Sequence, residues 1–177
     1  GSAVSSIGDL NDDGFDDFAI DNLNGRVPYR WGTGQGYVVF GKADGFDWSV
    51  DLALLDGTNG FVINGARFFD ESGAAVSFAG DVNGDGLTDL IVGASGDEPN
   101  GFGSGASFVV FGKTDGTAVE LSNIETGSGG FVIEGAGRND RSGRSVSAAG
   151  DINADGLADL IVGAADADPN SSSDSGT

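Results

Sequence analysis

The chain has 177 residues, of which 33 are glycine, and its 28 acidic and 8 basic side chains give a formal net charge of −20. This charge excludes a simple binder of nucleic acids or anionic membranes, because both require a basic surface, and it favours a protein that binds cations. Cys and His are both absent, which excludes disulfides, cysteine-based metal sites and nucleophiles, and the commonest general base. Because no apolar run approaches the ~18 residues of a membrane span, we expect no membrane insertion.

In chain order, the sequence consists of a repeated unit. The opening stretch GSAVSSIGDLNDDGFDDFAI (1–20) recurs as GAAVSFAGDVNGDGLTDLIV (73–92) and GRSVSAAGDINADGLADLIV (143–162). Further along each unit, YVVFGK (37–42) matches FVVFGK (108–113), and GFVINGA (60–66) matches GFVIEGA (130–136). We therefore divide the chain into a first unit at 1–72, a second at 73–142 and the first half of a third at 143–177.

Each complete unit predicts four short strands, separated by Gly, Asn, Asp and Ser, and no segment has a helical period. In the second unit we expect these strands at 74–79, 89–93, 107–111 and 131–133. Four antiparallel strands that recur every ~70 residues predict an all-β fold of β-propeller blades. A β-sandwich is the main alternative, but it gives no reason for so regular a repeat. Closed propellers have four to eight blades, so we expect about two and a half blades of a larger or assembled propeller.

An acidic pattern, D-x-N-x-D-G-x-x-D, follows the first strand of every unit. Calcium takes six to eight oxygen ligands, and positions 1, 3, 5 and 9 would supply side chains, position 7 a carbonyl, and the glycine at position 6 a sharp turn. We expect three Ca²⁺ sites rather than Mg²⁺ sites, because Mg²⁺ sheds water reluctantly. The expected ligands are Asp9, Asn11, Asp13, the Phe15 carbonyl and Asp17; Asp81, Asn83, Asp85, the Leu87 carbonyl and Asp89; and Asp151, Asn153, Asp155, the Leu157 carbonyl and Asp159.

Other interpretations of these loops fit less well. Asp-Gly and Asn-Gly also make ordinary hairpin turns, but a turn alone does not require the same four side chains in three loops. An EF-hand requires a Glu at position 12, where this chain has Ile20, Val92 and Val162 inside apolar strands. The same apolar position argues against dockerin-type loops.

Taken together, VVFG and DxNxDGxxDLIVGA resemble the FG-GAP repeat of integrin α-subunit propellers and their bacterial relatives. The Phe-Gly and Gly-Ala pairs stand at 40–41, 111–112, 93–94 and 163–164. The third letter of the signature, proline, is replaced by Ser95 and Ala165, and the first unit reads AIDN instead of IVGA. The resemblance implies a seven-bladed propeller in which a structural ion sits in the hairpin between the first and second strands of a blade.

The alternating strand direction assigns the loops to two faces. The acidic hairpins would share one face with the connections between third and fourth strands. The opposite face would carry the loop 22–36, where Tyr29, Arg30 and Trp31 cluster. These residue types dominate binding hot spots, and the integrin resemblance implies that partners bind on this face. The nearby Phe68 and Phe69 could instead pack between blades.

We consider three functions. The first is a calcium-stabilised adhesion or protein-recognition module, extracellular or at the cell surface and of bacterial origin, whose partners are further blades of the same chain or of neighbouring copies and a protein or glycan ligand. The second is a purely structural spacer or matrix repeat of a larger secreted protein. The third is the non-catalytic propeller of a secreted hydrolase, since no activating base accompanies the many serines and we expect no catalysis within this chain.

Overall fold

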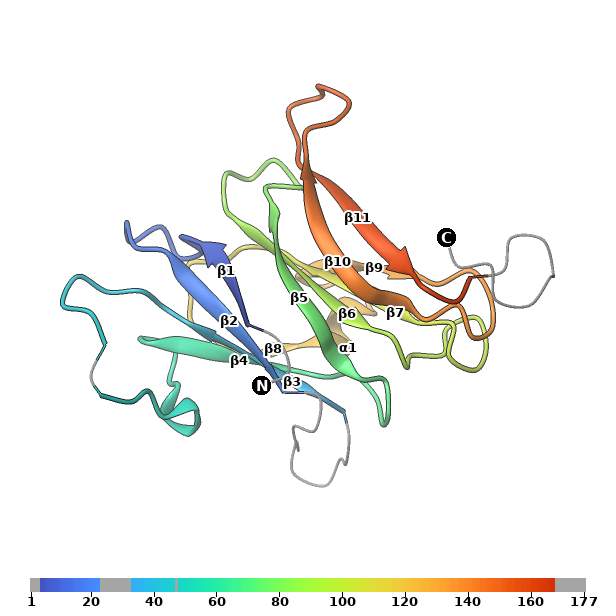
Figure 1. Cartoon of the computed structure of the whole chain (residues 1–177). Helices are drawn as coiled ribbons and strands as arrows, with labels where there is room; N and C mark the ends of the chain where they lie inside the picture. The colour runs from blue at the N-terminus through green and yellow to red at the C-terminus, as the bar shows by residue number, and fades with distance from the viewer. Residues whose placement is uncertain (1–3, 23–32, 47, 168–177) are drawn as a thin grey trace.

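The computed structural model describes residues 4–22, 33–46 and 48–167 (Figure 1). The predicted partner-binding residues Tyr29, Arg30 and Trp31 lie outside these described residues. Almost all regular structure is β-sheet, which confirms the predicted all-β class. The described strands are β1 (Val4–Gly8), β2 (Asp17–Asn22), β3 (Gln35–Val39), β4 (Gly60–Asn64), β5 (Ser72–Gly80), β6 (Asp89–Ala94), β7 (Ala106–Val110), β8 (Val119–Glu120), β9 (Gly130–Glu134), β10 (Ser142–Gly150) and β11 (Asp159–Ala164). A 3-10 helix, η1 (Leu52–Leu54), and one helical turn, α1 (Leu121–Ile124), complete the described elements.

The strands form antiparallel meanders that repeat from unit to unit, as expected for propeller blades. The first sheet has the order β1-β2-β3-β4-β8, the second β5-β6-β7-β9, and the third contains β10 and β11. Equivalent pairs have the same register, so that Val38 lies opposite Phe61 in the first sheet as Val109 lies opposite Phe131 in the second. Figure 1 shows the three sheets arranged side by side, from blue through green to orange.

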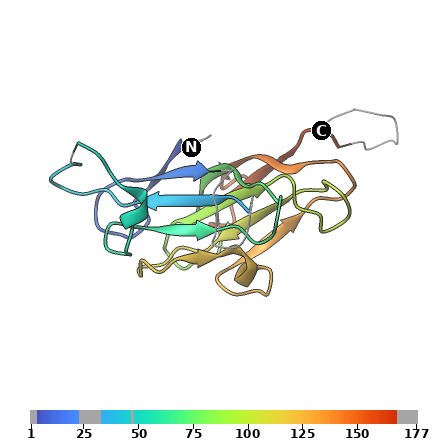
Figure 2. The ribbon, with the colours of Figure 1, turned by 90° about the horizontal axis from the view of Figure 1, so that it is seen from below.

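Strand β8 departs from this pattern. It belongs to the second unit in sequence, yet it pairs in parallel with β4 of the first sheet, through Ile63 with Val119 and Asn64 with Glu120. In Figure 2 the segment that contains β8 and α1 runs beneath β4. The sequence analysis predicted neither β8 nor α1.

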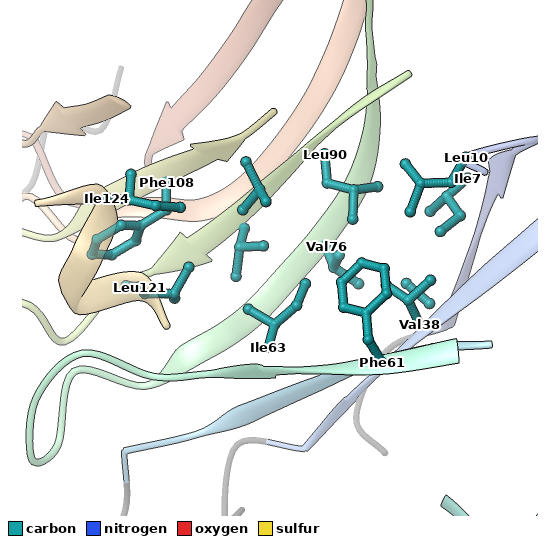
Figure 3. Close-up of a cluster of buried hydrophobic side chains, with 14 of the residues drawn as sticks. Ile7, Leu10, Val38, Phe61, Ile63, Val76, Leu90, Phe108, Leu121 and Ile124 are labelled. Atoms are coloured by element: carbon teal, nitrogen blue, oxygen red, sulfur yellow. The ribbon is translucent and has the colours of Figure 1, made fainter. Parts of the chain in front are cut away.

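The hydrophobic core lies where the sheets face one another. Its larger cluster contains residues of the first and second sheets and of α1, among them Ile7, Ile63, Phe108 and Leu121, all at most 1% exposed (Figure 3). A smaller cluster of Ala79, Ile91 and Val109 packs against side chains of the third sheet. In β6 and β7 every residue is buried. Both are inner strands of the second sheet, and the first and third sheets pack on its two faces. Within the described residues, no helix is long and apolar enough to cross a membrane.

Candidate metal centre

The three acidic loops lie at equivalent hairpin tips. They connect β1 to β2, β5 to β6, and β10 to β11, and in Figure 1 all three project from the same end of the sheets. The second and third loops touch, since the backbone N–H of Ala158 donates to the carbonyl of Asp81 at 2.9 Å. The repeat therefore places one acidic loop beside the next along one face.

The aspartate at position 1 holds the far side of its own loop. In the first loop, the backbone N–H groups of Asp13 and Gly14 donate to the two carboxylate oxygens of Asp9 at 3.0 and 2.8 Å. The same two bonds recur on Asp81, at 3.2 and 2.9 Å, and on Asp151, at 3.1 and 2.9 Å. Position 1 thus fixes the turn at the glycine of position 6.

Positions 3 and 5 form two successive side-chain turns. In the second loop, Asn83 Oδ1 accepts from the N–H of Asp85 at 2.8 Å, and Asp85 Oδ1 accepts from the N–H of Leu87 at 2.8 Å. The first loop has equivalent bonds at 3.1 and 2.9 Å, and the third at 2.8 and 2.9 Å. Because each of these oxygens accepts a backbone N–H two residues ahead, the loop curls around its own carboxylates.

The aspartate at position 9 connects the loop to the third strand. One oxygen of Asp89 accepts from the N–H of Val82 at 2.9 Å, and the other accepts from Gly112 at 2.7 Å. Asp17 makes the same pair of bonds, to Leu10 at 2.9 Å and to Gly41 at 2.7 Å. In the third loop, Asp159 accepts from Ile152 at 2.7 Å.

The glycine of each Phe-Gly pair packs closely on the acidic loop, a role that the sequence analysis did not identify. A Cβ at Gly112 would lie 2.5 Å from the Thr88 carbonyl oxygen and 2.6 Å from Leu87 Cβ, distances that no side chain tolerates. Gly41 meets the first loop in the same way, at 2.5 Å from the Asp16 oxygen. The signal in the sequence was the recurrence of Phe-Gly at a similar distance after the acidic loop, with Gly41 24 residues after Asp17 and Gly112 23 residues after Asp89.

Electrostatics distinguishes position 9 from the other carboxylates. Asp17 and Asp89 are at most 1% exposed. Burial raises the pKa of Asp89, the hydrogen bonds from Gly112 and Val82 lower it, and repulsion from Asp85 and Asp81 raises it further. Burial likewise raises the pKa of Asp17 against its two backbone hydrogen bonds. The carboxylates at positions 1 and 5 thus lie close enough to position 9 to repel it.

The donor chemistry of each loop fits calcium, with three carboxylates, one amide oxygen and one carbonyl. Within the described residues, which include all three loops, no three Asp or Glu side chains are gathered as metal ligands would be. Here the loop carboxylates accept backbone N–H groups, and Asn83 Nδ2 donates to Asp85 at 2.9 Å. Asp81 Oδ1 accepts two N–H groups, from Gly84 and Asp85, whereas Asp81 Oδ2 accepts one and keeps a further lone pair. The donor atoms of each loop, and the mutual repulsion of its carboxylates, thus suit a divalent cation. To surround the cation, these side chains would have to turn toward the centre of the loop.

The opposite end of the sheets has a cavity of about 570 Å³ between the units. Its walls include Phe69, Phe102, Arg141 and Arg144. Phe69 is 74% and Phe102 64% exposed, so Phe69 does not pack between blades. The cavity also holds two of the 8 basic side chains of a chain with a net charge of −20. Glu71 and Glu98 also line the cavity, and a surface that combines exposed aromatic rings with charges of both signs can contact a partner.

Comparison with known proteins agrees with this geometry. Residues 72–110 and 142–177 match the sequence profile of the FG-GAP repeat. The chain thus contains FG-GAP repeats at these two positions. The first matched segment runs from the start of β5 to the end of β7 and so includes the whole second acidic loop.

The relatives of this FG-GAP protein include integrin α subunits. It is 38% identical to integrin alpha-X of Homo sapiens over 92 residues, which are 52% of this chain and 7% of that protein. It is 37% identical to integrin alpha-M of Mus musculus over 117 residues, which are 66% of this chain and 9% of that protein. The chain therefore spans less than a tenth of the length of these two relatives.

Proposed function

We propose that this chain is a calcium-stabilised segment of an FG-GAP propeller that acts in extracellular adhesion or protein recognition. Its blades would be 1–72, 73–142 and the first half of a third at 143–177, with further blades beside them. The observation that supports calcium most directly is the hydrogen-bond pattern that recurs in three loops of different sequence: positions 1, 3 and 5 accept equivalent backbone N–H groups in each loop, and position 9 accepts the N–H of position 2.

In this proposal each loop holds one Ca²⁺ through the side chains at positions 1, 3, 5 and 9 and the carbonyl at position 7. The bound ion supplies positive charge to a site in which three carboxylates repel one another. Position 9 has a second role, since Asp17 and Asp89 also hold the N–H of Gly41 and Gly112. Calcium binding would thereby stabilise the junction between the hairpin and the third strand, and the role is structural rather than catalytic.

Recognition is proposed for the face opposite the acidic loops. The described part of that face contributes the cavity with Phe69, Phe102 and Arg141. Tyr29, Arg30 and Trp31, predicted in the same group of loops, remain candidates for the partner surface. The ligand would be a protein or a glycan outside the cell or at its surface.

Calorimetric melting in about 1 mM CaCl₂ and in EDTA tests the calcium proposal. A site with a Kd of ~10⁻⁵ to 10⁻⁴ M would gain roughly 1.4–2.7 kcal/mol at this calcium concentration. Asp85→Ala should remove the contribution of one site, whereas Asp44→Ala, an exposed acid outside the loops, should keep the full calcium shift. An identical melting temperature in calcium and EDTA would refute the proposal.

The spacer function is the second candidate, because rigid blades serve it without a ligand. Binding of the chain to a panel of glycans and matrix proteins separates the two. The double variant Tyr29→Ala with Trp31→Ala should lose such binding and keep its melting temperature if the face recognises a partner. No binding by either protein supports the spacer, whereas undiminished binding by the double variant would show that the ligand contacts other residues.

A further inference from the structure

The connection between the third and fourth strands of each unit, which we call its arm, comprises described residues 42–46 and 48–55 in the first unit and 113–124 in the second. The two arms are similar in sequence. FGKADG (40–45) matches FGKTDG (111–116), and VDLALL (50–55) matches VELSNI (119–124). The two arms nevertheless have different surroundings.

The arm of the second unit docks on the outermost strand of the first unit, β4. Its β8 pairs with β4, and Asn64 Nδ2 donates to Glu120 Oε1 at 2.6 Å. Lys113 Nζ lies 4.7 Å from the centroid of the Phe61 ring. Gly116 meets the backbone of Gly57 so closely that a Cβ there would lie 1.8 Å from the carbonyl oxygen. The arm therefore contacts the first unit in four ways: through strand pairing, a side-chain hydrogen bond, a cation–π contact and close backbone packing.

The arm of the first unit makes none of the equivalent contacts with the described residues. Gly45, the counterpart of Gly116, has nothing within 4 Å of its Cβ position. Lys42 lies over Phe46 of its own arm, at 5.7 Å from the ring centroid. Trp48 is fully exposed and Leu54 is 68% exposed. Two of the exposed side chains, Phe46 and Leu54, border a cavity of about 450 Å³.

The matching acceptor is open at the other end. β9, the outermost strand of the second unit, is the last strand of its sheet. Gly127, the counterpart of Gly57, has nothing within 4 Å of its Cβ position. Phe131 is 40% exposed, whereas its counterpart Phe61, covered by Lys113, is 3% exposed. The described residues thus contain one filled junction, one arm without an acceptor and one acceptor without an arm.

We propose that the arm of the first unit is a docking segment for the outermost strand of another propeller blade that carries the Gly-Phe-Val-Ile pattern of β4. This inference rests on the proposed propeller segment. The occupant follows from the filled junction, since Val50 and Asp51 stand where Val119 and Glu120 pair with β4. A second copy does not suit the site: its own β10 and β11 already pack beside the second sheet, where the blade bearing the incoming arm would have to lie.

Cysteine trapping tests this docking, because the chain has no Cys of its own. A second copy of residues 1–72 is fused directly ahead of Gly1, so that the junction has the same spacing as the natural junction between residues 72 and 73. The added copy is the probe blade, and its β4 is the acceptor strand. Asn64→Cys in the added copy is combined with Asp51→Cys in the original first unit. The matched control replaces Asp51→Cys with Ala53→Cys, two residues farther along the arm. The filled junction is trapped in parallel with Asn64→Cys and Glu120→Cys, both in the original units.

If the arm docks, the Asp51→Cys pair should form an intramolecular disulfide about tenfold or more faster than the Ala53→Cys pair, and at a rate similar to the filled junction. Equal rates for Asp51→Cys and Ala53→Cys would overturn the proposal. A disulfide between two chains would also overturn the proposal, because it would show that the arm docks on a second copy. The proposal would fail as well if Asn64→Cys and Glu120→Cys formed no disulfide, because the docking of the second arm is the basis of the inference. The readout is a covalent bond independent of calcium and of any ligand, so its failure is distinguishable from failure of the proposed function.

Discussion

Asp70 shows how one buried carboxylate makes the stability of this protein depend on pH. It lies in the connection from the first to the second unit and is 1% exposed. Its oxygens accept from the N–H of Arg67 at 2.8 Å and from the hydroxyl and N–H of Ser72 at 3.0 and 3.3 Å. Burial nevertheless dominates and raises its pKa from 3.8 to about 6, with repulsion from Asp97 as a smaller cause.

We predict that Asp70→Asn removes this dependence. A raised pKa means that the folded protein holds the proton more tightly, so the stabilisation is complete below pH 3.8 and is lost as the pH rises through about 6. The loss is on the order of 3 kcal/mol. Urea unfolding in EDTA at a series of pH values should show the variant gaining stability relative to the original as pH rises from 4 to 7. Parallel curves would show that Asp70 ionises normally.

Position 4 of the acidic loops offers a second test on single residues. Its backbone is left-handed in all three loops, with φ of 61° at Asp12, 78° at Gly84 and 61° at Ala154. A residue with a Cβ pays roughly 1–2 kcal/mol in this conformation. Gly84→Ala should therefore lower the free energy of unfolding by about 1 kcal/mol or more, also because its Cβ would lie 3.2 Å from Leu157 Cδ2. Ala154→Gly should not destabilise, and equal effects of the two changes on thermal melting would contradict this reasoning.

At the scale of elements, the contact between the acidic hairpin and the third strand depends on the glycine of Phe-Gly. Gly112→Ala would force Thr88 and Leu87 away and strain the hydrogen bond to Asp89. We expect a loss of about 1–3 kcal/mol, as for other overpacked sites, together with weaker calcium binding by the second loop. Gly36→Ala is the control, because its Cβ would meet Ile63 at an ordinary 3.5 Å. Titration calorimetry with calcium and chemical unfolding measure the two effects.

The strands could be predicted from the sequence because each is a short apolar run between turn residues, repeated in phase. The acidic loops were equally visible, since the side chains at positions 1, 3 and 5 bond within a single loop; their role as metal ligands stays a prediction. Strand β8 was not predictable in this way: it has two residues, and its pairing with Ile63 and Asn64 depends on how one unit packs against the other. The role of Gly41 and Gly112 was also missed, because it arises from a contact across strands.

For the whole molecule, the net charge of −20 predicts a strong effect of salt. Self-repulsion destabilises a compact acidic protein, and the screening length falls from ~30 Å at 0.01 M to ~3 Å at 1 M salt. In EDTA, the melting temperature should rise by several degrees between low and high NaCl. With saturating calcium the rise should be smaller, since bound ions would already neutralise the loops. A salt effect of equal size in calcium and EDTA would argue against ions in the loops.

The sharing of β8 between units also bears on how the chain is made. Among the described residues, the last strand of the sheet that begins at Val4 pairs at its outer edge with residues 119–120. A ribosome adds roughly 5–20 residues per second, so the edge of β4 would stay uncovered for roughly 3–11 s of synthesis. During that interval a nascent chain exposes a strand edge to which another nascent chain can pair. The first unit thus depends, for its own protection, on the timely arrival of the second.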